Sequence, residues 1–145
     1  MLKSILTGLL LTILSVGIHA AGTSWWIQVL SRQSWLKISR DKRLGSLQVL
    51  CLTATVLLLL HFAEVAVWGL TYWLLLRDQF NAFEQAVYFS MVTFTSLGYG
   101  DVVISGPWRL LAGIQAIAGL LLFGWSTALL FSVVQRLWEL GNSKK

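Results

Sequence analysis

Charged residues are scarce in this sequence. Asp, Glu, Lys and Arg together make up 12% of its 145 residues, whereas 57% are hydrophobic. A soluble domain of this size normally carries about 25% charged residues. The composition therefore excludes an ordinary soluble domain and indicates an integral membrane protein with room for little besides membrane segments.

Cysteine and catalytic groups are scarce as well. The single cysteine, Cys51, excludes an intrachain disulfide, and no metal-ligand spacing surrounds it. The ionisable residues inside the apolar runs are His19, His61 and Glu64, and no nucleophile–base set is visible. We therefore predict that the protein is not an enzyme and has neither a cofactor nor a structural metal.

Long hydrophobic runs, in contrast, dominate the chain. Three of them exceed the ~20 residues that a helix needs to cross a ~30 Å hydrocarbon core. We predict an all-α membrane protein with transmembrane helices at residues 1–30, 47–76 and 107–138. A cleaved signal peptide is the alternative for the first run, although its cleavage site lacks a small residue at the required position.

Basic residues gather between the first two runs. Segment 31–46 contains Arg32, Lys37, Arg40, Lys42 and Arg43 against the single acid Asp41, whereas segment 77–106 is richer in acids than in bases. The positive-inside rule places loop 31–46 and the tail 139–145 in the cytoplasm, and the N-terminus outside. The net charge of +5 is explained in this way, and we expect no nucleic-acid partner.

Residues 77–106 are too few to cross the membrane and return as two full helices. Asn81 and Glu84 have the spacing of a capping box, which predicts a helix at 82–95 of about 21 Å. The stretch "SLGYGD" cannot continue that helix, and Pro107 suits the first turn of the next one. The pattern predicts a half-helix that enters from outside and an extended segment that returns.

A polar, non-helical segment at membrane depth must be buried in protein or line a water-filled path. Three helices from one chain cannot bury it, but a ring of identical chains can. Glycine permits backbone torsions that other residues avoid, so carbonyl oxygens from several copies can face one axis and replace the hydration shell of a cation.

The stretch "TFTSLGYGDV" resembles the signature of the potassium channel superfamily, and "AVYFSMVTFT" and "IAGLLLFG" resemble its pore helix and inner helix. The resemblance implies a homotetramer with a re-entrant pore helix and K⁺ in a filter at 96–100. It implies hinge bending at Gly119 and support for the filter from residues behind it. The implied filter residues are Ser96, Leu97, Gly98, Tyr99 and Gly100, and the implied supports are Tyr88, Thr93, Thr95 and Asp101. For Asp101, a bond to Tyr88 and simple solvation both stay open.

The helix after the filter carries a stripe at helical spacing that would line the cavity below the filter. Its members are Leu120, Phe123, Thr127, Phe131 and Gln135. Phe131 or Gln135 would form the inner constriction, which could act as a dewetting gate. Lipid-facing or packing residues are the alternative interpretation.

We therefore expect a passive potassium channel in the lipid bilayer of a cell membrane, most simply a bacterial inner membrane. The filter begins Ser-Leu where the family usually has Thr-Val, so a non-selective monovalent cation channel is the first alternative. A non-conducting accessory subunit is the second. No arginine-rich segment in the sequence could carry gating charge.

Glu64 is the most unusual residue of the second run, because an acid at that depth costs about 2.5–3.5 kcal/mol on insertion scales. It shares a helical face with His61, Trp68 and Tyr72. We expect this face to meet the pore helix. Possible partners for Glu64 are Thr93, Thr95, Ser96 and Tyr99. Glu64 either braces the packing or, with His61, senses protons, whereas His19 is expected to be a packed or interfacial residue.

Overall fold

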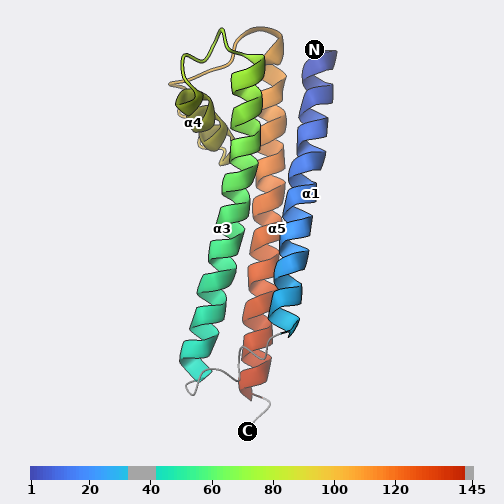
Figure 1. The fold of residues 1–145 in the computed structure, drawn as a ribbon, viewed down its shortest axis with the longest axis vertical. Helices are drawn as coiled ribbons and strands as arrows, with labels where there is room; N and C mark the ends of the chain where they lie inside the picture. Colours follow the sequence, from blue (N-terminus) through green and yellow to red (C-terminus); the bar gives the residue numbers. More distant parts are fainter. Residues whose placement is uncertain (33–41, 143–145) are drawn as a thin grey trace.

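The computed structural model describes residues 1–32 and 42–142. The elements in chain order are α1 (Leu2–Arg32), α3 (Lys42–Leu75), α4 (Phe83–Phe94), the 3-10 turn η1 (Gly106–Trp108) and α5 (Arg109–Asn142). No strand occurs in these two described ranges. The three long helices run side by side, and the short α4 lies beside one end of α3 (Figure 1).

Three helices are long and apolar enough to cross a membrane, namely Leu2–Arg32, Leu44–Leu75 and Gly106–Glu139. The expected all-helical protein with three membrane-spanning helices is therefore found. Helix α3 begins earlier than predicted, so residues 42–46 of the predicted loop 31–46 are helical, and residues 139–142 of the predicted tail continue α5. Residues 31–32 of the predicted loop belong to α1, and residues 33–41 and 143–145 lie outside the described residues.

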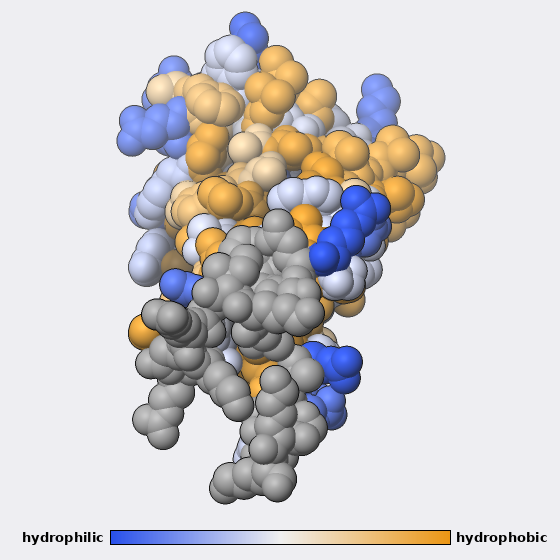
Figure 2. Space-filling view, turned by 60° about the horizontal axis from the view of Figure 1, so that its bottom comes forward, coloured by the Kyte–Doolittle hydropathy of each residue, from blue (hydrophilic) through white to orange (hydrophobic). Residues whose placement is uncertain are grey.

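The outward surfaces of the bundle are apolar. In the space-filling view, hydrophobic residues form much of the visible surface (Figure 2). On α1 the outward face exposes Leu6, Leu10 and Ile13. Such a surface suits contact with lipid tails, because they are as apolar as these side chains.

The inward face of α1 is small and polar instead. Its buried residues recur at intervals of three and four, which is the period of one helical face: Ser4, Gly8, Leu11, Ser15, His19, Thr23 and Trp26. The indole N–H of Trp26 donates to the hydroxyl oxygen of Thr53 at 3.0 Å, and that of Trp68 donates to Ser15 at 3.0 Å. This face, which we call the polar stripe of α1, docks the helix against α3 and α5.

Helix α4 begins one residue later than the capping-box prediction. Ala82 occupies the N-cap position without a side-chain cap bond, so the assignment of Asn81 as cap and Glu84 as its partner is wrong. Gln85 instead reaches back, and its side-chain oxygen accepts the backbone N–H of Asn81 at 3.0 Å. Gln85 is the third helical residue from this N-cap, so the side chain that reaches back to the N–H of Asn81 is one residue later than predicted.

The far end of α4 is packed closely against the long helices. A Cβ built on Gly119 of α5 would collide with the backbone carbonyl of Phe94, the last residue of α4. Aromatic side chains fill the space around the helix, with Tyr72 edge-on to Phe89 at a ring separation of 5.0 Å. The 12-residue α4 is thereby held in a fixed position beside α3.

Candidate functional site

The segment between α4 and η1, residues 95–105, is called the return loop here. Ser96, Gly98 and Gly100 have φ values of +59°, +57° and +79°, and Ser96 is the only non-glycine residue with positive φ in the part of the chain that the structure describes. Leu97 and Tyr99 lie between them without positive φ. The loop therefore alternates between left-handed and ordinary backbone torsions at the five residues predicted to form the filter.

The start of the return loop is tied to the end of α4. The backbone N–H groups of Ser96 and Leu97 donate to the carbonyl oxygens of Thr93 and Val92, both at 3.0 Å. The Thr95 hydroxyl donates to the carbonyl of Met91 at 2.8 Å. These bonds satisfy carbonyl groups that a helix C-terminus leaves without partners, and they fix where the loop departs.

The other side of the loop is held by a pair of side chains. The Tyr88 hydroxyl donates to Oδ2 of Asp101 at 2.7 Å, so of the two alternatives left open for Asp101 the bond to Tyr88 is found. The bond favours the ionised carboxylate, and it lowers the pKa of Asp101 below its ordinary value. It also raises the pKa of the Tyr88 hydroxyl. Asp101 is thus an anion that links the loop to the middle of α4.

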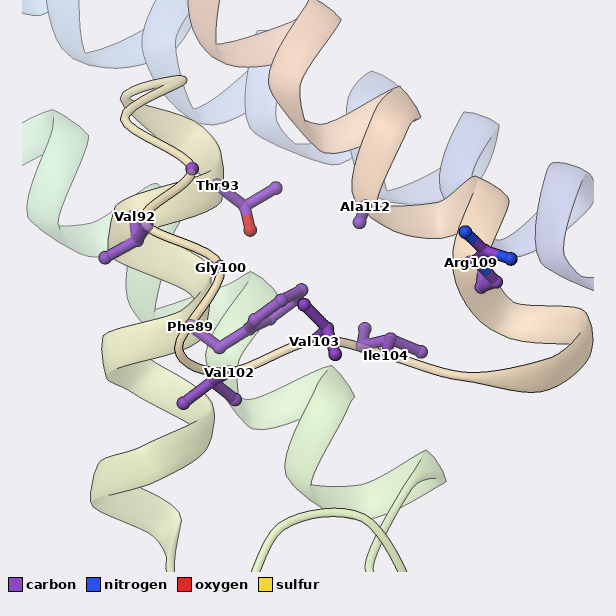
Figure 3. A pocket seen from close by; sticks show the side chains of 10 residues that line it. Phe89, Val92, Thr93, Gly100, Val102, Val103, Ile104, Arg109 and Ala112 are labelled. Atoms are coloured by element: carbon purple, nitrogen blue, oxygen red, sulfur yellow. The ribbon is translucent and has the colours of Figure 1, made fainter.

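Large apolar side chains of the return loop are uncovered within one chain. Leu97 is 59% exposed, Tyr99 68% and Val103 70%. A pocket of about 270 Å³ lies between α4, the loop and the start of α5. Phe89, Thr93, Val103 and Arg109 are among the side chains around it (Figure 3). The loop therefore exposes apolar side chains and has open space beside it.

The predicted pore-lining stripe of α5 divides into two parts. Leu120, Thr127, Phe131 and Gln135 are exposed in the single chain. Phe123 is half-buried, and its ring lies 4.5 Å from that of His61 and 5.5 Å from that of Phe94. Phe123 therefore packs within the subunit, whereas the other four remain available to a cavity, a neighbour or lipid.

The predicted partners of Glu64 are wrong. Its carboxylate is fully buried and lies 2.8 Å from Nδ1 of His19 and 3.0 Å from Nδ1 of His61. Its hydrogen bonds go to these two histidines, and none joins it to Thr93 of α4 or to Thr95, Ser96 or Tyr99 of the return loop. The reason is that α1 covers this part of α3 and supplies a histidine there.

The face of α3 that carries Glu64 is buried as expected, together with His61, Trp68 and Tyr72. Its polar atoms bond mainly to residues of α1 and α5. Glu64 and Trp68 bond to α1, and the Tyr72 hydroxyl donates to Oε1 of Gln115 in α5 at 2.8 Å. Proton sensing by Glu64 and His61 stays an untested prediction.

Two buried polar residues of α5 were not predicted from the sequence. Gln115 donates from Nε2 to the hydroxyl oxygen of Ser90 in α4 at 2.7 Å. Ser126 lies 3.2 Å from Nε2 of His19 and 3.0 Å from Nε2 of His61. A signal existed, because a polar side chain within a membrane-spanning run usually faces protein.

Comparison with known proteins gives one finding. A family model described as ion channel matches residues 51–136, which is more than half of the chain. The match covers α4, the return loop and most of the two long helices that flank them, and it leaves out α1. No curated protein and no solved structure matches the chain.

Proposed function

The chain belongs to the ion channel family, so it is a multi-pass membrane protein whose expected activity is passive ion conduction, and we propose that it conducts potassium selectively. In this proposal four copies of Ser96, Leu97, Gly98, Tyr99 and Gly100 form the filter. The permeant ion needs no cofactor and no chemical step.

The observation that carries this proposal is the alternation of φ along the filter residues. In an ordinary strand, successive carbonyls point to opposite sides. Left-handed torsions at alternate residues, here Ser96, Gly98 and Gly100, turn every second peptide unit and allow all the carbonyls to face one side. Stacked rings of such oxygens can replace the hydration shell of a cation.

The setting of the return loop supports assembly from several copies. Its non-helical backbone cannot face lipid, because each unpaired polar group in hydrocarbon costs several kcal/mol. Within one chain the loop and its apolar side chains are largely exposed. Neighbouring copies of the same chain provide the missing cover, and a four-fold ring leaves one axial path lined by the loops.

Helix α4 supports a cation in that path. Its C-terminal end, at Phe94, leads directly into the loop, and the C-terminus of a helix carries about −0.5 elementary charge. In the proposed assembly α4 is a re-entrant pore helix with this end toward the centre. The exposed residues Leu120, Thr127, Phe131 and Gln135 of α5 then line the cavity below, with Gly119 as a possible bending point.

The orientation in this proposal follows the charge distribution. The basic segment 31–46 faces the cytoplasm and the return loop faces outside, most simply in a bacterial inner membrane. A non-selective monovalent cation channel is the second candidate, because Ser96-Leu97 replaces the usual filter start.

The test is the reversal potential of purified protein in planar bilayers under opposed K⁺ and Na⁺ gradients. We expect a reversal potential close to the K⁺ equilibrium value. Gly98→Ala should abolish conduction or selectivity, because Gly98 has a φ of +57° that a Cβ opposes. Gly17→Ala is the matched control, since Gly17 also has open space around it but no positive φ.

Each alternative has its own outcome in this experiment. A wild-type reversal potential midway between the two gradients would identify a non-selective channel. Absence of any current from the wild type would favour an accessory subunit. Unaltered selectivity in Gly98→Ala would place the filter elsewhere.

A further inference from the structure

Four buried polar side chains meet between the three long helices. His19 comes from α1, His61 and Glu64 from α3, and Ser126 from α5, and we call them the His–Glu cluster. Glu64 and His19 are fully buried, whereas His61 and Ser126 are each 8% exposed. The proposed filter and cavity do not use this cluster.

The four contacts of the cluster form a closed ring. Both histidines present Nδ1 to the Glu64 carboxylate, at 2.8 and 3.0 Å, and both present Nε2 to the Ser126 hydroxyl, at 3.2 and 3.0 Å. Two neutral imidazoles and one hydroxyl supply three protons for these four contacts. With an ionised Glu64, the ring therefore has an uncompensated negative charge, and one of its four contacts has no hydrogen.

Contrary to the expectation from the sequence that the protein has no structural metal, we propose that the His–Glu cluster binds a divalent transition-metal ion of the Zn²⁺ class. The ligands are Nδ1 of His19, Nδ1 of His61 and the carboxylate of Glu64, whose ligand atoms all lie within 4.8 Å of one another. With the metal at the Nδ1 side, each neutral histidine carries its proton on Nε2. Both Nε2–H groups then donate to the two lone pairs of Ser126 Oγ. The contacts at Nδ1 need no hydrogen, so the three protons of the neutral groups are sufficient.

The donor set fits this class of ion. Imidazole nitrogen suits Zn²⁺ and its neighbours, whereas Ca²⁺ and Mg²⁺ take oxygen ligands. Two histidines with one glutamate is a known Zn²⁺ ligand set, with bonds of about 2.0–2.2 Å. Because each carboxylate oxygen already faces a different histidine, bidentate Glu64 completes four donor atoms without another group.

The surroundings fit a structural site. A histidine that binds metal usually donates its other ring N–H to an oriented acceptor, and Ser126 offers one acceptor to both histidines. A single extra proton, on Glu64 or on either histidine, is the competing occupant, since it would also supply a hydrogen to each of the four contacts. Trp125 lies edge-on to the His19 ring at 5.7 Å, and Phe123 lies at 4.5 Å from the His61 ring. The ion would therefore join α1 to α3 in a dry setting.

The test is metal binding by the purified full-length protein in detergent, without any flux measurement. After removal of metal with a chelator, Zn²⁺ should rebind at about one ion per chain and raise the melting temperature. Co²⁺ should give the visible absorption of a four-coordinate nitrogen–oxygen site. Because ion conduction plays no part, failure here leaves the proposed channel function intact.

Variants separate the cluster from other sites. Glu64→Gln should lose Zn²⁺ and Co²⁺ binding, whereas Glu84→Gln on the exposed start of α4 should bind as the wild type does. Ser126→Ala should bind about 10–100-fold more weakly, because an outer partner of the ligands is lost. Ser132→Ala is its matched control, since Ser132 on the same helix donates only to the carbonyl of Ala128.

Two results would overturn the proposal. The first is a wild-type protein that takes up neither ion and shows no change in melting temperature, which would identify the cluster as a proton-filled ring. The second is binding that Glu64→Gln or Ser126→Ala leaves unchanged. The wild-type measurement decides even if a variant does not fold.

Discussion

Asp101 and Glu64 are carboxylates in opposite settings. Asp101 is exposed in the return loop and accepts a hydrogen bond from Tyr88, whereas Glu64 is enclosed by two histidines between helices. Asp101 therefore keeps its charge through a hydroxyl donor and solvent. Water does not reach Glu64, so an ionised Glu64 would need a positive charge from a bound ion or a protonated histidine.

The Tyr88–Asp101 bond should be insensitive to pH in the physiological range. Because the bond lowers the pKa of Asp101 below its ordinary value of 3.8, the stabilisation is present above that value and is lost only as pH falls through the lowered pKa. In Tyr88→Phe, the Asp101 pKa should rise toward 3.8. Carboxyl ¹³C titration by NMR measures it, and an unchanged midpoint would show that the hydroxyl is not its partner.

Gly119 should tolerate no larger residue. Alanine would press its Cβ against the Phe94 carbonyl at the end of α4, and overpacking of this kind typically costs about 1–3 kcal/mol. Gly113→Ala, on the same helix with open space, should be neutral or stabilising. Melting temperatures of both variants in detergent test this, and equal values would contradict the close approach.

Helix α1 shows what a sequence can and cannot reveal about an element. Hydrophobicity and length predicted that it spans a membrane, and its docking face could not be predicted because serine, threonine and glycine also occur on lipid-facing surfaces. The histidine partner that α1 supplies to Glu64 was missed because the two residues are distant in the sequence. His19 and Glu64 lie 45 positions apart, and nothing local in the sequence indicates which helices become neighbours.

Local patterns served better within single elements. The long apolar runs predicted the long helices, and the glycines predicted the break after α4, since both signals are local in the sequence. The one-residue error at the start of α4 arose because Gln85, the neighbour of Glu84, is also able to reach back to the backbone N–H of Asn81. The exposed face of α5 followed from helical spacing, except for Phe123, whose ring is drawn inward by Phe94 and His61.

Docking of α1 should depend on the Trp26–Thr53 bond. Trp26→Phe removes the indole N–H that donates to Thr53 at 3.0 Å, and hydrogen bonds between helices in membranes contribute about 0.6 kcal/mol on average, up to about 1.7. Trp25→Phe changes a neighbouring, 59% exposed ring and is the control. Thermal unfolding in detergent should rank Trp26→Phe below both the wild type and the control.

At the scale of the whole molecule, the proposed channel needs more than one chain. The polar backbone of the return loop is exposed in the single chain and requires protein cover in a membrane. We expect native mass spectrometry of the detergent-solubilised protein to give a mass of four chains. A conducting species with the mass of one or two chains would contradict the four-fold ring.

The polar stripe of α1 also has a consequence for biogenesis. Helix α1 leaves the ribosome before α3 and α5, which contain the partners of Trp26, Ser15 and His19. Until those partners emerge, this face must stay beside the insertion machinery or another polar surface, because lipid offers its hydroxyl and imidazole groups no hydrogen bonds. Release into the bilayer is therefore expected to await Glu64, so that the first and second spans leave the translocon as a pair.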